Sequence, residues 1–254
     1  MFSVAYLQYS GRGPLRHEEQ LLKAECDRLG LPVILYTRKN IERRNLPLSR
    51  ETFIAGDMPV MHGAMRQLGI EVPEPNDYPA SLRGFMHRRV WKSTLEAVEQ
   101  GISLNMGEPV FAKPAERRKS FTGKVFSSHA DFAAVGSASR RQEVWCSEVV
   151  SWLAEFRIYV IGERIVDIDH YAGDPAVSPD QRVIEEALIT YRQSGEAPSA
   201  YGIDFGVLAS GQTALIEAND GYALGAYSIE ARPYAELVMR RWSELLERAD
   251  RISA

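Results

Sequence analysis

Short apolar runs alternate with amphipathic stretches over the first third of the chain. Residues 2–9 form an apolar run typical of a strand, and a turn leads from it into a helix that ends at Leu29, before Gly30. A second short strand is predicted over residues 33–36, after Pro32. Because a strand–helix–strand unit joins neighbouring parallel strands, this pattern predicts a small parallel sheet.

A proline-rich stretch separates this leader from the rest of the chain. Residues 72–79 contain three prolines in eight positions, so they cannot form a helix or a central strand. We therefore expect a domain boundary near residue 82. The predicted organisation is a small α/β domain over residues 1–82 and a larger domain over residues 83–254, with lobes at about 83–145 and 146–254.

The first lobe is predicted to contain one helix and two strands. Hydrophobic periodicity favours an amphipathic helix over residues 86–100. An apolar strand then runs from Pro109 to Lys113, and a polar loop follows it as far as Gly123. Residues 144–150 have the apolar character of another strand, which leads into the second lobe.

Two predicted hairpins, each followed by a helix, make up the second lobe. The first hairpin closes through Gly162-Glu163, a glycine-first two-residue turn that joins antiparallel strands. The predicted strands are residues 155–161, 164–171, 201–208 and 213–218, and the predicted helices are residues 180–194 and 233–249. Two lobes of this kind behind a small α/β leader place the chain in the α+β class.

Composition narrows the classes of protein to which the chain can belong. Of the 254 residues, 45% are hydrophobic and 25% are charged, which is typical of a folded protein rather than a disordered one. The net charge of −4 argues against a globally basic nucleic-acid-binding protein. No apolar run approaches the roughly 18 residues that span a bilayer, and the first residues lack the basic start of a signal peptide. We therefore expect a cytoplasmic protein without nucleic-acid or membrane partners.

Hydrolase chemistry finds little support in the sequence. Cys26 and Cys146 lie in helix-like and strand-like surroundings, which indicates reduced thiols rather than a disulfide. The five histidines form no pair at the spacing of zinc ligands. The Gly-x-Ser-x-Gly motif of serine hydrolases does not occur either.

The second hairpin carries three oxygen-bearing side chains on one face. Side chains alternate between the faces of a strand, so Glu217 and Asn219 share a side, while Ile216 and Ala218 are expected to point to the core. The partner strand turns Asp204 toward the same side. Two carboxylates and an amide suit Mg²⁺, a hard cation that prefers oxygen ligands. The alternative is a set of solvated acidic side chains on an exposed face.

Positively charged side chains are predicted beside this polar face. In the first hairpin, Arg157 lies on the face opposite to Phe156 and Ile158. Upstream, Lys113 ends an apolar strand and Lys119 lies in the polar loop. Arginine and lysine beside a metal–phosphate site can contact phosphate oxygens directly. Away from such a site, the same residues would form an ordinary solvated basic face.

Taken in order along the chain, these residues resemble the ATP-grasp enzymes. The resemblance rests on five segments: Phe111-Ala-Lys113-Pro, Ser147-Glu148-Val-Val, Glu155-Phe-Arg157, Asp204 and Glu217-x-Asn219. The chain is most similar to a divergent clade that includes the eukaryotic cell-division-cycle translation-initiation regulators and their bacterial and phage relatives. That similarity lies in Phe53-Ile-Ala-Gly56, Arg88-Arg-Val-Trp91, Lys119-x-Phe121-Thr-Gly123, Glu217-Ala-Asn-Asp-Gly221 and Leu224-Gly-x-Tyr227.

The resemblance implies an ATP site between two α+β lobes, behind a small domain that commonly precedes the ATP-grasp domain. By resemblance, Lys113 and Lys119 hold phosphates, and Asp204, Glu217 and Asn219 bind one or two Mg²⁺ ions. Arg157 and Lys119 are the implied catalytic residues, with Arg157 stabilising the transferring phosphoryl group or an oxyanion. The residues implied to meet the adenine and ribose are Ser147, Glu148, Val149 and Val150. The loop 116–124 has only one glycine, fewer than many ATP-grasp loops.

The implied activity is ATP- and Mg²⁺-dependent ligation of a carboxylate to an amine through an acyl phosphate, with free, peptide or protein substrates. Two other functions stay open: a nucleotide-binding regulator or assembly factor with little turnover, and a kinase-like phosphotransferase. The sequence does not identify the carboxylate, the amine or the oligomeric state.

Overall fold

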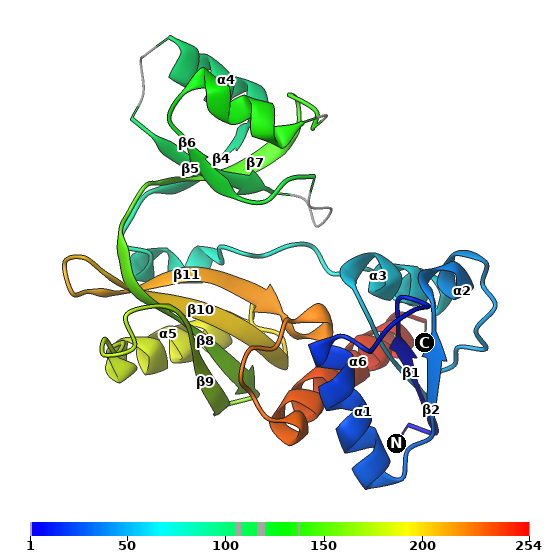
Figure 1. Ribbon diagram of the computed structural model, residues 1–254. Coiled ribbons are helices and arrows are strands. Elements are labelled where there is room, and N and C mark those ends of the chain that lie inside the picture. Colours follow the sequence, from blue (N-terminus) through cyan, green and yellow to red (C-terminus); the bar gives the residue numbers. More distant parts are fainter. Residues whose placement is uncertain (1, 105–107, 116–119, 137, 254) are drawn as a thin grey trace.

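Three sheets organise the computed structural model, which describes residues 2–104, 108–115, 120–136 and 138–253 (Figure 1). Each sheet has its own cluster of buried apolar residues. The α+β class predicted from the sequence is confirmed. None of the helices in the described ranges has both the length and the apolar character that a membrane crossing requires.

The first sheet is the small parallel sheet predicted for the leader. Its central strand β1 (Val4–Gln8) pairs in parallel with β2 (Val33–Tyr36) on one side and with β3 (Thr52–Ala55) on the other. The connecting helices are α1 (His17–Leu29), α2 (Arg38–Glu42) and α3 (Met58–Gln67). Helix α1 ends where Gly30 adopts a left-handed conformation, with φ of 67°.

The leader completes its core with the last helix of the chain. Helix α6 (Ala231–Ser253) packs against α1 and β3, and its apolar side chains join the same buried cluster as those of β1 and β3. Trp242 is fully buried there, and its indole N–H donates to the backbone oxygen of Thr52 at 2.8 Å. Residues from the beginning and from the end of the chain therefore share one core. The domain boundary near residue 82 stays a prediction.

The first lobe is built on a four-stranded antiparallel sheet with the order β4-β7-β5-β6. Its strands are β4 (Val90–Thr94), β5 (Val110–Pro114), β6 (Lys124–Phe126) and β7 (Glu143–Glu148), and its helices are α4 (Leu95–Ser103) and the 3₁₀ helix η2 (His129–Val135). The prediction of one helix over residues 86–100 is wrong. Val90 and Trp91 extend into a strand, for which β-branched and aromatic side chains are suited, and the helix begins only after Thr94, whose hydroxyl accepts from Ala97 N at 3.2 Å.

The second lobe contains both predicted hairpins in one antiparallel sheet with the order β11-β10-β8-β9. The strands are β8 (Trp152–Ile161), β9 (Arg164–Gly173), β10 (Ala200–Leu208) and β11 (Thr213–Asp220). Ile161 pairs with Arg164, which confirms the two-residue turn, and Gly162 there has a φ of 58°. Helix α5 (Gln181–Gln193) and the 3₁₀ helix η1 (Ala80–Phe85) contribute to the core of this lobe, and η3 (Gly221–Ala223) follows β11.

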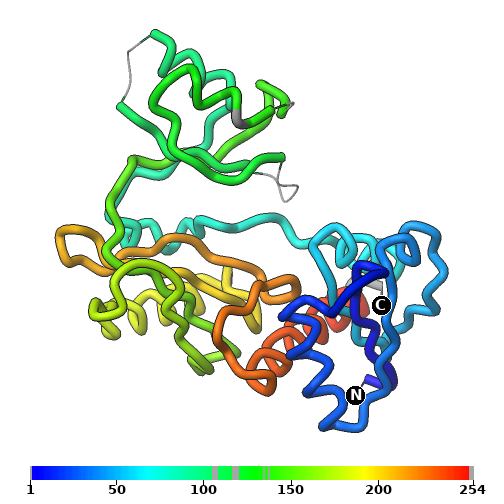
Figure 2. Tube along the Cα trace, viewed as in Figure 1, coloured from blue at the N-terminus to red at the C-terminus, as the bar shows by residue number. Residues whose placement is uncertain are grey.

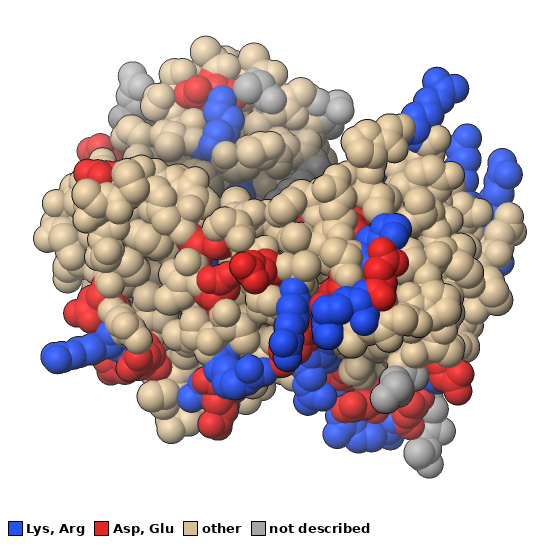
Figure 3. All heavy atoms as spheres, turned by 60° about the horizontal axis from the view of Figure 1, so that its bottom comes forward, with Lys and Arg blue, Asp and Glu red and all other residues tan. Residues whose placement is uncertain are grey.

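Two neighbouring segments connect the lobes, one before β4 and one after β7 (Figure 2). They are joined by hydrogen bonds, since Glu148 N donates to Arg89 O at 3.1 Å. The linker that follows α3 lies beside β11, where Ala218 N donates to Asp77 O at 2.8 Å. On the face of the molecule drawn in Figure 3, Lys and Arg are interspersed with Asp and Glu rather than gathered in one patch.

Candidate active site

A row of charged side chains crosses the sheet of the second lobe. Glu217 on β11 pairs with Asp204 on β10, and Asp204 pairs with Arg157 on β8. Residues that are paired across antiparallel strands project from the same face, so the three side chains meet. Asp204 and Arg157 are buried, with 3% and 8% of their surface exposed. Asn219 lies two residues beyond Glu217, and its amide donates to Glu217 Oε1 at 3.3 Å and to Asp204 Oδ2 at 3.4 Å.

An irregularity in the pairing changes one predicted orientation. The register shifts after Asp204, so that Phe205 pairs with Leu215 and Ile216 has no partner of its own. Ile216 is half-buried and lines a cavity, so the prediction that it points to the core is wrong. A β-bulge inserts one extra residue and locally breaks the alternation of faces. Arg88 stabilises the bulge, because its guanidinium donates to Leu215 O at 2.6 Å and to Ile216 O at 3.0 Å.

Arg157 is held from three directions. Its Nε and Nη2 donate to the two oxygens of Asp204 at 2.8 and 2.7 Å, and its Nη1 donates to Gly225 O at 3.1 Å. The guanidinium also lies 4.9 Å from the ring centre of Tyr227. Burial raises the pKa of Asp204 above its usual value, and the contact with Arg157 offsets only part of that effect. The pair fixes the guanidinium in one orientation.

Lys113 reaches this row from the other lobe. Its ammonium group forms ion pairs with Glu217 and with Asp77 Oδ2, the latter at 2.7 Å, and it lies 4.7 Å from the ring centre of Tyr78. Burial opposes ionisation of Glu217, but the ammonium outweighs it and lowers the pKa of this carboxyl group. One cation from the first lobe thus binds two carboxylates on the opposite side of the cleft.

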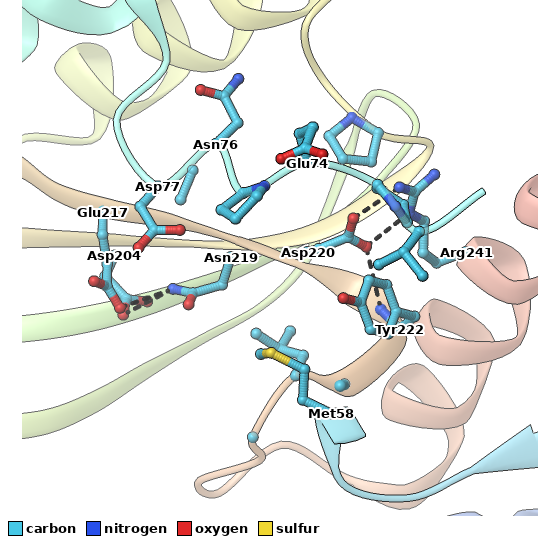
Figure 4. A pocket seen from close by; sticks show the side chains of 18 of the residues that line it. Met58, Glu74, Asn76, Asp77, Asp204, Glu217, Asn219, Asp220, Tyr222 and Arg241 are labelled. Carbon is cyan, nitrogen blue, oxygen red and sulfur yellow. Dashed lines mark hydrogen bonds and ion pairs between the residues drawn. The ribbon is translucent and has the colours of Figure 1, made fainter. Parts of the chain in front are cut away.

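Asp77 is a site residue that sequence reasoning missed. It lies in the proline-rich stretch, which predicts a linker and gives no indication of chemistry. The backbone hydrogen bond between Asp77 and Ala218 adds this part of the linker to the edge of β11. Figure 4 shows the side chains of Asp77, Asp204, Glu217 and Asn219 turned toward one another.

The row opens into a cavity of about 1290 Å³ between the lobes. Phe111, Lys113 and Phe121 line it from the first lobe, and Arg157, Asp204, Glu217 and Asn219 line it from the second. It continues along the linker toward Tyr222 and Arg241 (Figure 4). Small-molecule sites are commonly about 300–1,000 Å³, so the cavity has room for more than one small substrate.

The other predicted nucleotide-binding residues are placed differently. Lys119 lies outside the described residues. Ser147, Glu148, Val149 and Val150 form the end of β7 and the start of the connection between the lobes, and none of these four is among the residues that line the cavity. Ser147 is buried, and the carboxylate of Glu148 accepts from Arg89 N at 2.9 Å. Their role toward adenine and ribose stays a prediction.

The donor atoms at the row are suited to a divalent cation. In the part of the chain that the structure describes, no group of three or more His, Cys, Asp or Glu side chains is arranged to hold a metal ion, so a site here depends on the amide of Asn219 as well as on the two carboxylates. Carboxylate and amide oxygens are ligands that Mg²⁺ accepts. Asp204, Glu217 and Asn219 are therefore the residues that would hold the ion.

A second ion-pair network anchors the end of β11 next to these donors. Arg241 on α6 is almost fully buried, and its Nε and Nη2 donate to the two oxygens of Asp220, each at 2.7 Å. Its Nη1 donates to Glu244 Oε2 at 2.8 Å. Ser199 N donates to the same glutamate oxygen at 2.8 Å. Because Asp220 directly follows Asn219, Arg241 fixes the position of the proposed donor set.

This network makes stability depend on pH in acid. Burial opposes ionisation of Glu244, but Arg241 and Ser199 lower its pKa to about 2, against 4.5 for an ordinary glutamate. The stabilisation is complete above about pH 4.5 and is lost as the pH falls toward 2. We expect Glu244→Gln to lower the free energy of unfolding at pH 7 by on the order of 3 kcal/mol, with a smaller difference at pH 3. Urea titrations at both pH values measure this.

Glu247→Gln is the matched control, because Glu247 is an exposed glutamate on the same helix. Its free energy of unfolding should stay close to that of the unmodified protein at each pH. If the curves for Glu244→Gln and the unmodified protein run parallel between pH 7 and pH 3, the ion pair with Arg241 does not have the assigned strength.

The segment 225–229 is fastened to the site by side chains from two parts of the molecule. From the second lobe, Asp169 accepts from the backbone N–H groups of Ser228 and Ile229 at 2.9 and 3.0 Å, and the hydroxyl of Tyr159 accepts from Tyr227 N at 3.1 Å. From the leader, the His17 ring contacts Tyr227 O at 3.1 Å. This segment supplies both the carbonyl and the aromatic ring that contact Arg157.

Comparison with known proteins gives a consistent result. A sequence model of the ATP-grasp domain, the second family of its clade, matches residues 85–237, more than half of the chain. No curated protein sequence matches. Among solved structures, D-alanyl-alanine synthetase A from Vibrio cholerae O1 biovar eltor is similar over 100% of both chains, with a TM-score of 0.60 and 13% sequence identity.

Two further structures have the same arrangement. D-alanine–D-alanine ligase from Bacillus anthracis complexed with ATP is similar over 97% of this chain and 99% of that chain, with a TM-score of 0.57 and 12% identity. The macrocyclase MdnC from Microcystis aeruginosa, bound with its precursor peptide MdnA, is similar over 93% and 99%, with a TM-score of 0.53 and 11% identity. At these identities the likeness shows a common fold, the ATP-grasp fold.

Proposed function

Because this chain belongs to the ATP-grasp domain family, we propose that it is an ATP- and Mg²⁺-dependent ligase that joins a carboxylate to an amine through an acyl phosphate. The observation that carries the proposal is the row of Glu217, Asp204 and Arg157, which faces Lys113 across a cavity between two lobes. The specific relation to the translation-initiation regulators stays a prediction.

The proposed reaction has two balanced steps. A carboxylate oxygen of the first substrate takes the terminal phosphoryl group of ATP, which gives an acyl phosphate and ADP. The nitrogen of the amine then attacks the acyl carbon, forms the C–N bond and expels inorganic phosphate, while the amine loses its proton to the surroundings. Such phosphoryl transfer depends mainly on positioning and on neutralisation of negative charge.

The chain's own residues supply both requirements. Arg157 is fixed by Asp204 in an orientation that leaves its guanidinium beside the cavity, where it would stabilise negative charge on the transferring group or on an oxyanion. Lys113 would bind a phosphate in place of one of its two carboxylates. Magnesium, when bound, supplies further charge neutralisation, and Asp204, Glu217 and Asn219 are the residues proposed to hold it.

The remaining proposed roles concern the nucleotide and the second substrate. We assign phosphate contacts to Lys119, and adenine and ribose contacts to the segment from Ser147 to Val150. The structure of MdnC holds a precursor peptide, which supports a peptide or protein as one substrate of this chain. The cytoplasm is the proposed location, because both cysteines are free thiols.

An ADP-release assay with metal removal tests the proposal. The protein is incubated with ATP, Mg²⁺ and pairs drawn from the twenty protein amino acids, D-alanine and a peptide library, and the products are identified by mass. We expect at least one pair to release ADP and phosphate together with a condensed product. Excess chelator should reduce that release to the rate without enzyme, because the two carboxylates need a divalent partner to hold phosphates, and added Mg²⁺ should restore it.

The alternative functions give different results in the same experiment. A nucleotide-binding regulator would bind ATP tightly but release no ADP in response to any substrate. A phosphotransferase would leave γ-labelled phosphate on a lasting product instead of releasing it. Either result would remove the ligase proposal.

A further inference from the structure

A second cavity, of about 500 Å³, lies where the leader meets the second lobe. It is bounded by α1, by the segment 55–59 that follows β3, and by residues 222–225. The carboxyl end of β3 opens onto it, next to the central strand β1. In sheets with parallel strands, ligands bind at such carboxyl ends, where the chain changes direction across the sheet. The leader thus brings a pocket of its own to the edge of the active site.

The two cavities adjoin along a short shared wall. Met58 and residues 222–225 line both of them. Gly225 is the residue of that wall whose carbonyl accepts from Arg157. Any molecule seated in the second cavity would therefore lie next to the guanidinium that the proposed reaction uses.

Gly225 leaves an open space in the wall. Its φ is outside the left-handed range, so no backbone conformation requires glycine there. A Cβ at this position would meet Arg157 Nη1 at 3.6 Å and Glu18 Oε1 at 3.8 Å, which are ordinary contact distances. Crowding does not require glycine either. The missing side chain leaves Arg157 and Glu18 facing the same point, one from each cavity.

The second cavity is apolar on most sides and negatively charged at one. Leu22, Tyr234 and Val238 are buried side chains that line it. Its charged residues are one guanidinium and three carboxylates, namely Arg16, Glu18, Glu19 and Asp57. Apolar walls with a few charged groups are the usual features of a small-molecule site.

Among these carboxylates, Glu18 has the most capacity for a ligand. Glu19 accepts from Arg16 Nε at 2.9 Å, and Asp57 accepts from Gln8 Nε2 at 2.9 Å and from Val60 N at 3.1 Å. Within the described residues, the hydrogen bond that Glu18 accepts is a long one, from Ala226 N at 3.4 Å. A half-buried carboxylate with free acceptor sites beside apolar walls favours a cation that carries an apolar group.

We propose that the second cavity binds the amine substrate, with Glu18 holding its ammonium group and the apolar walls holding its substituent. The proposal rests on the proposed ligase function and adds the site and the chemical class of its amine: a primary ammonium on an apolar side chain or residue. The amine nitrogen then reaches over Gly225 toward the group that Arg157 stabilises. Glu18 is a substrate-binding residue in this arrangement.

Direct binding tests the site with L-leucinamide, which has an ammonium group and an apolar side chain but no carboxylate. It is titrated by calorimetry into the protein loaded with Mg²⁺ and a non-hydrolysable ATP analogue. We expect binding to the unmodified protein, and binding weakened about tenfold or more in Glu18→Gln, because hydrogen bonds to charged groups are the strong ones. Gly225→Ala should weaken it as well, since its methyl group fills the shared space. Affinity for the ATP analogue should be unchanged in Glu18→Gln.

Asp27→Asn is the matched control, because Asp27 is an acidic residue of α1 that pairs with Lys23 and lines neither cavity. It should bind L-leucinamide as the unmodified protein does. Equal binding by Glu18→Gln, or no binding of L-leucinamide to the unmodified protein, overturns the proposal.

Hydroxylamine separates this proposal from the ligase proposal. As a small uncharged nucleophile at neutral pH, it traps an acyl phosphate as a hydroxamate without needing a carboxylate to hold it. Hydroxamate formation from the active carboxylate should be the same in Glu18→Gln and in the unmodified protein, while amide formation with L-leucinamide falls about tenfold or more in the variant. Absence of any hydroxamate from the unmodified protein contradicts the ligase function instead of the amine site.

Discussion

Replacing Asp204 with asparagine is expected to reduce substrate-dependent ADP release by about 10²–10³-fold. The change keeps the shape of the side chain but removes its negative charge and one of the two oxygens that accept from Arg157. It therefore removes a proposed ligand of the metal ion and loosens the guanidinium that stabilises the transferring group. The rate is measured with saturating ATP, Mg²⁺ and the best substrate pair from the ADP-release assay.

Asp167→Asn provides the comparison for that variant. Asp167 is an aspartate on β9 of the same sheet, it is partly exposed, and it lies outside the cavity lining, so its loss should leave the rate within about twofold of normal. Circular dichroism shows whether each variant is folded. A folded Asp204→Asn protein that turns over within tenfold of the unmodified rate would contradict the assigned role of the carboxylate.

The largest loss of stability is expected for Arg241→Met. Methionine fills much of the same volume but leaves Asp220 and Glu244 without the cation that binds both of them. Removing one partner of a buried ion pair costs about 3–5 kcal/mol, because the remaining charges stay buried without compensation. For a chain of this size, such a loss lowers the melting temperature by roughly 10 °C. Urea titration at pH 7 and thermal melting measure the two quantities.

The neighbouring Arg240 is the control, since it is an arginine on the same helix but is exposed. Arg240→Met should change the free energy of unfolding by less than about 0.5 kcal/mol. If both variants were equally stable, the network at the end of β11 would contribute nothing to folding. Loss of activity in Arg241→Met at a temperature where the protein is fully folded would show that the network also positions Asn219.

Strand alternation predicted the main features of the candidate site. Because the pattern around Asp204 and Glu217 has a clear apolar face, it predicts correctly that the polar residues between the apolar ones share the other face. The same rule failed at Ile216, because a bulge adds a residue that no local pattern shows. The bulge is supported by Arg88, which is distant in sequence, so only the folded chain reveals it.

Other errors and omissions also come from long-range contacts. Periodicity alone does not separate a short strand from the start of a helix, and the segment that begins at Val90 becomes a strand because it pairs with β7. Asp77 was missed because a carboxylate in a proline-rich stretch is usually solvated. It becomes part of the site only when the linker binds to the edge of β11.

The shared core of the leader and α6 has a consequence for how the chain matures. The parallel sheet leaves the ribosome first, yet Trp242 and the rest of its packing surface are among the last residues to be translated. Until then the apolar faces of β1 and β3 are uncovered, and a chain cut short before α6 would expose them permanently. Such truncated chains are natural substrates for chaperones and proteases, so the final helix acts as a checkpoint that only a completed polypeptide can pass.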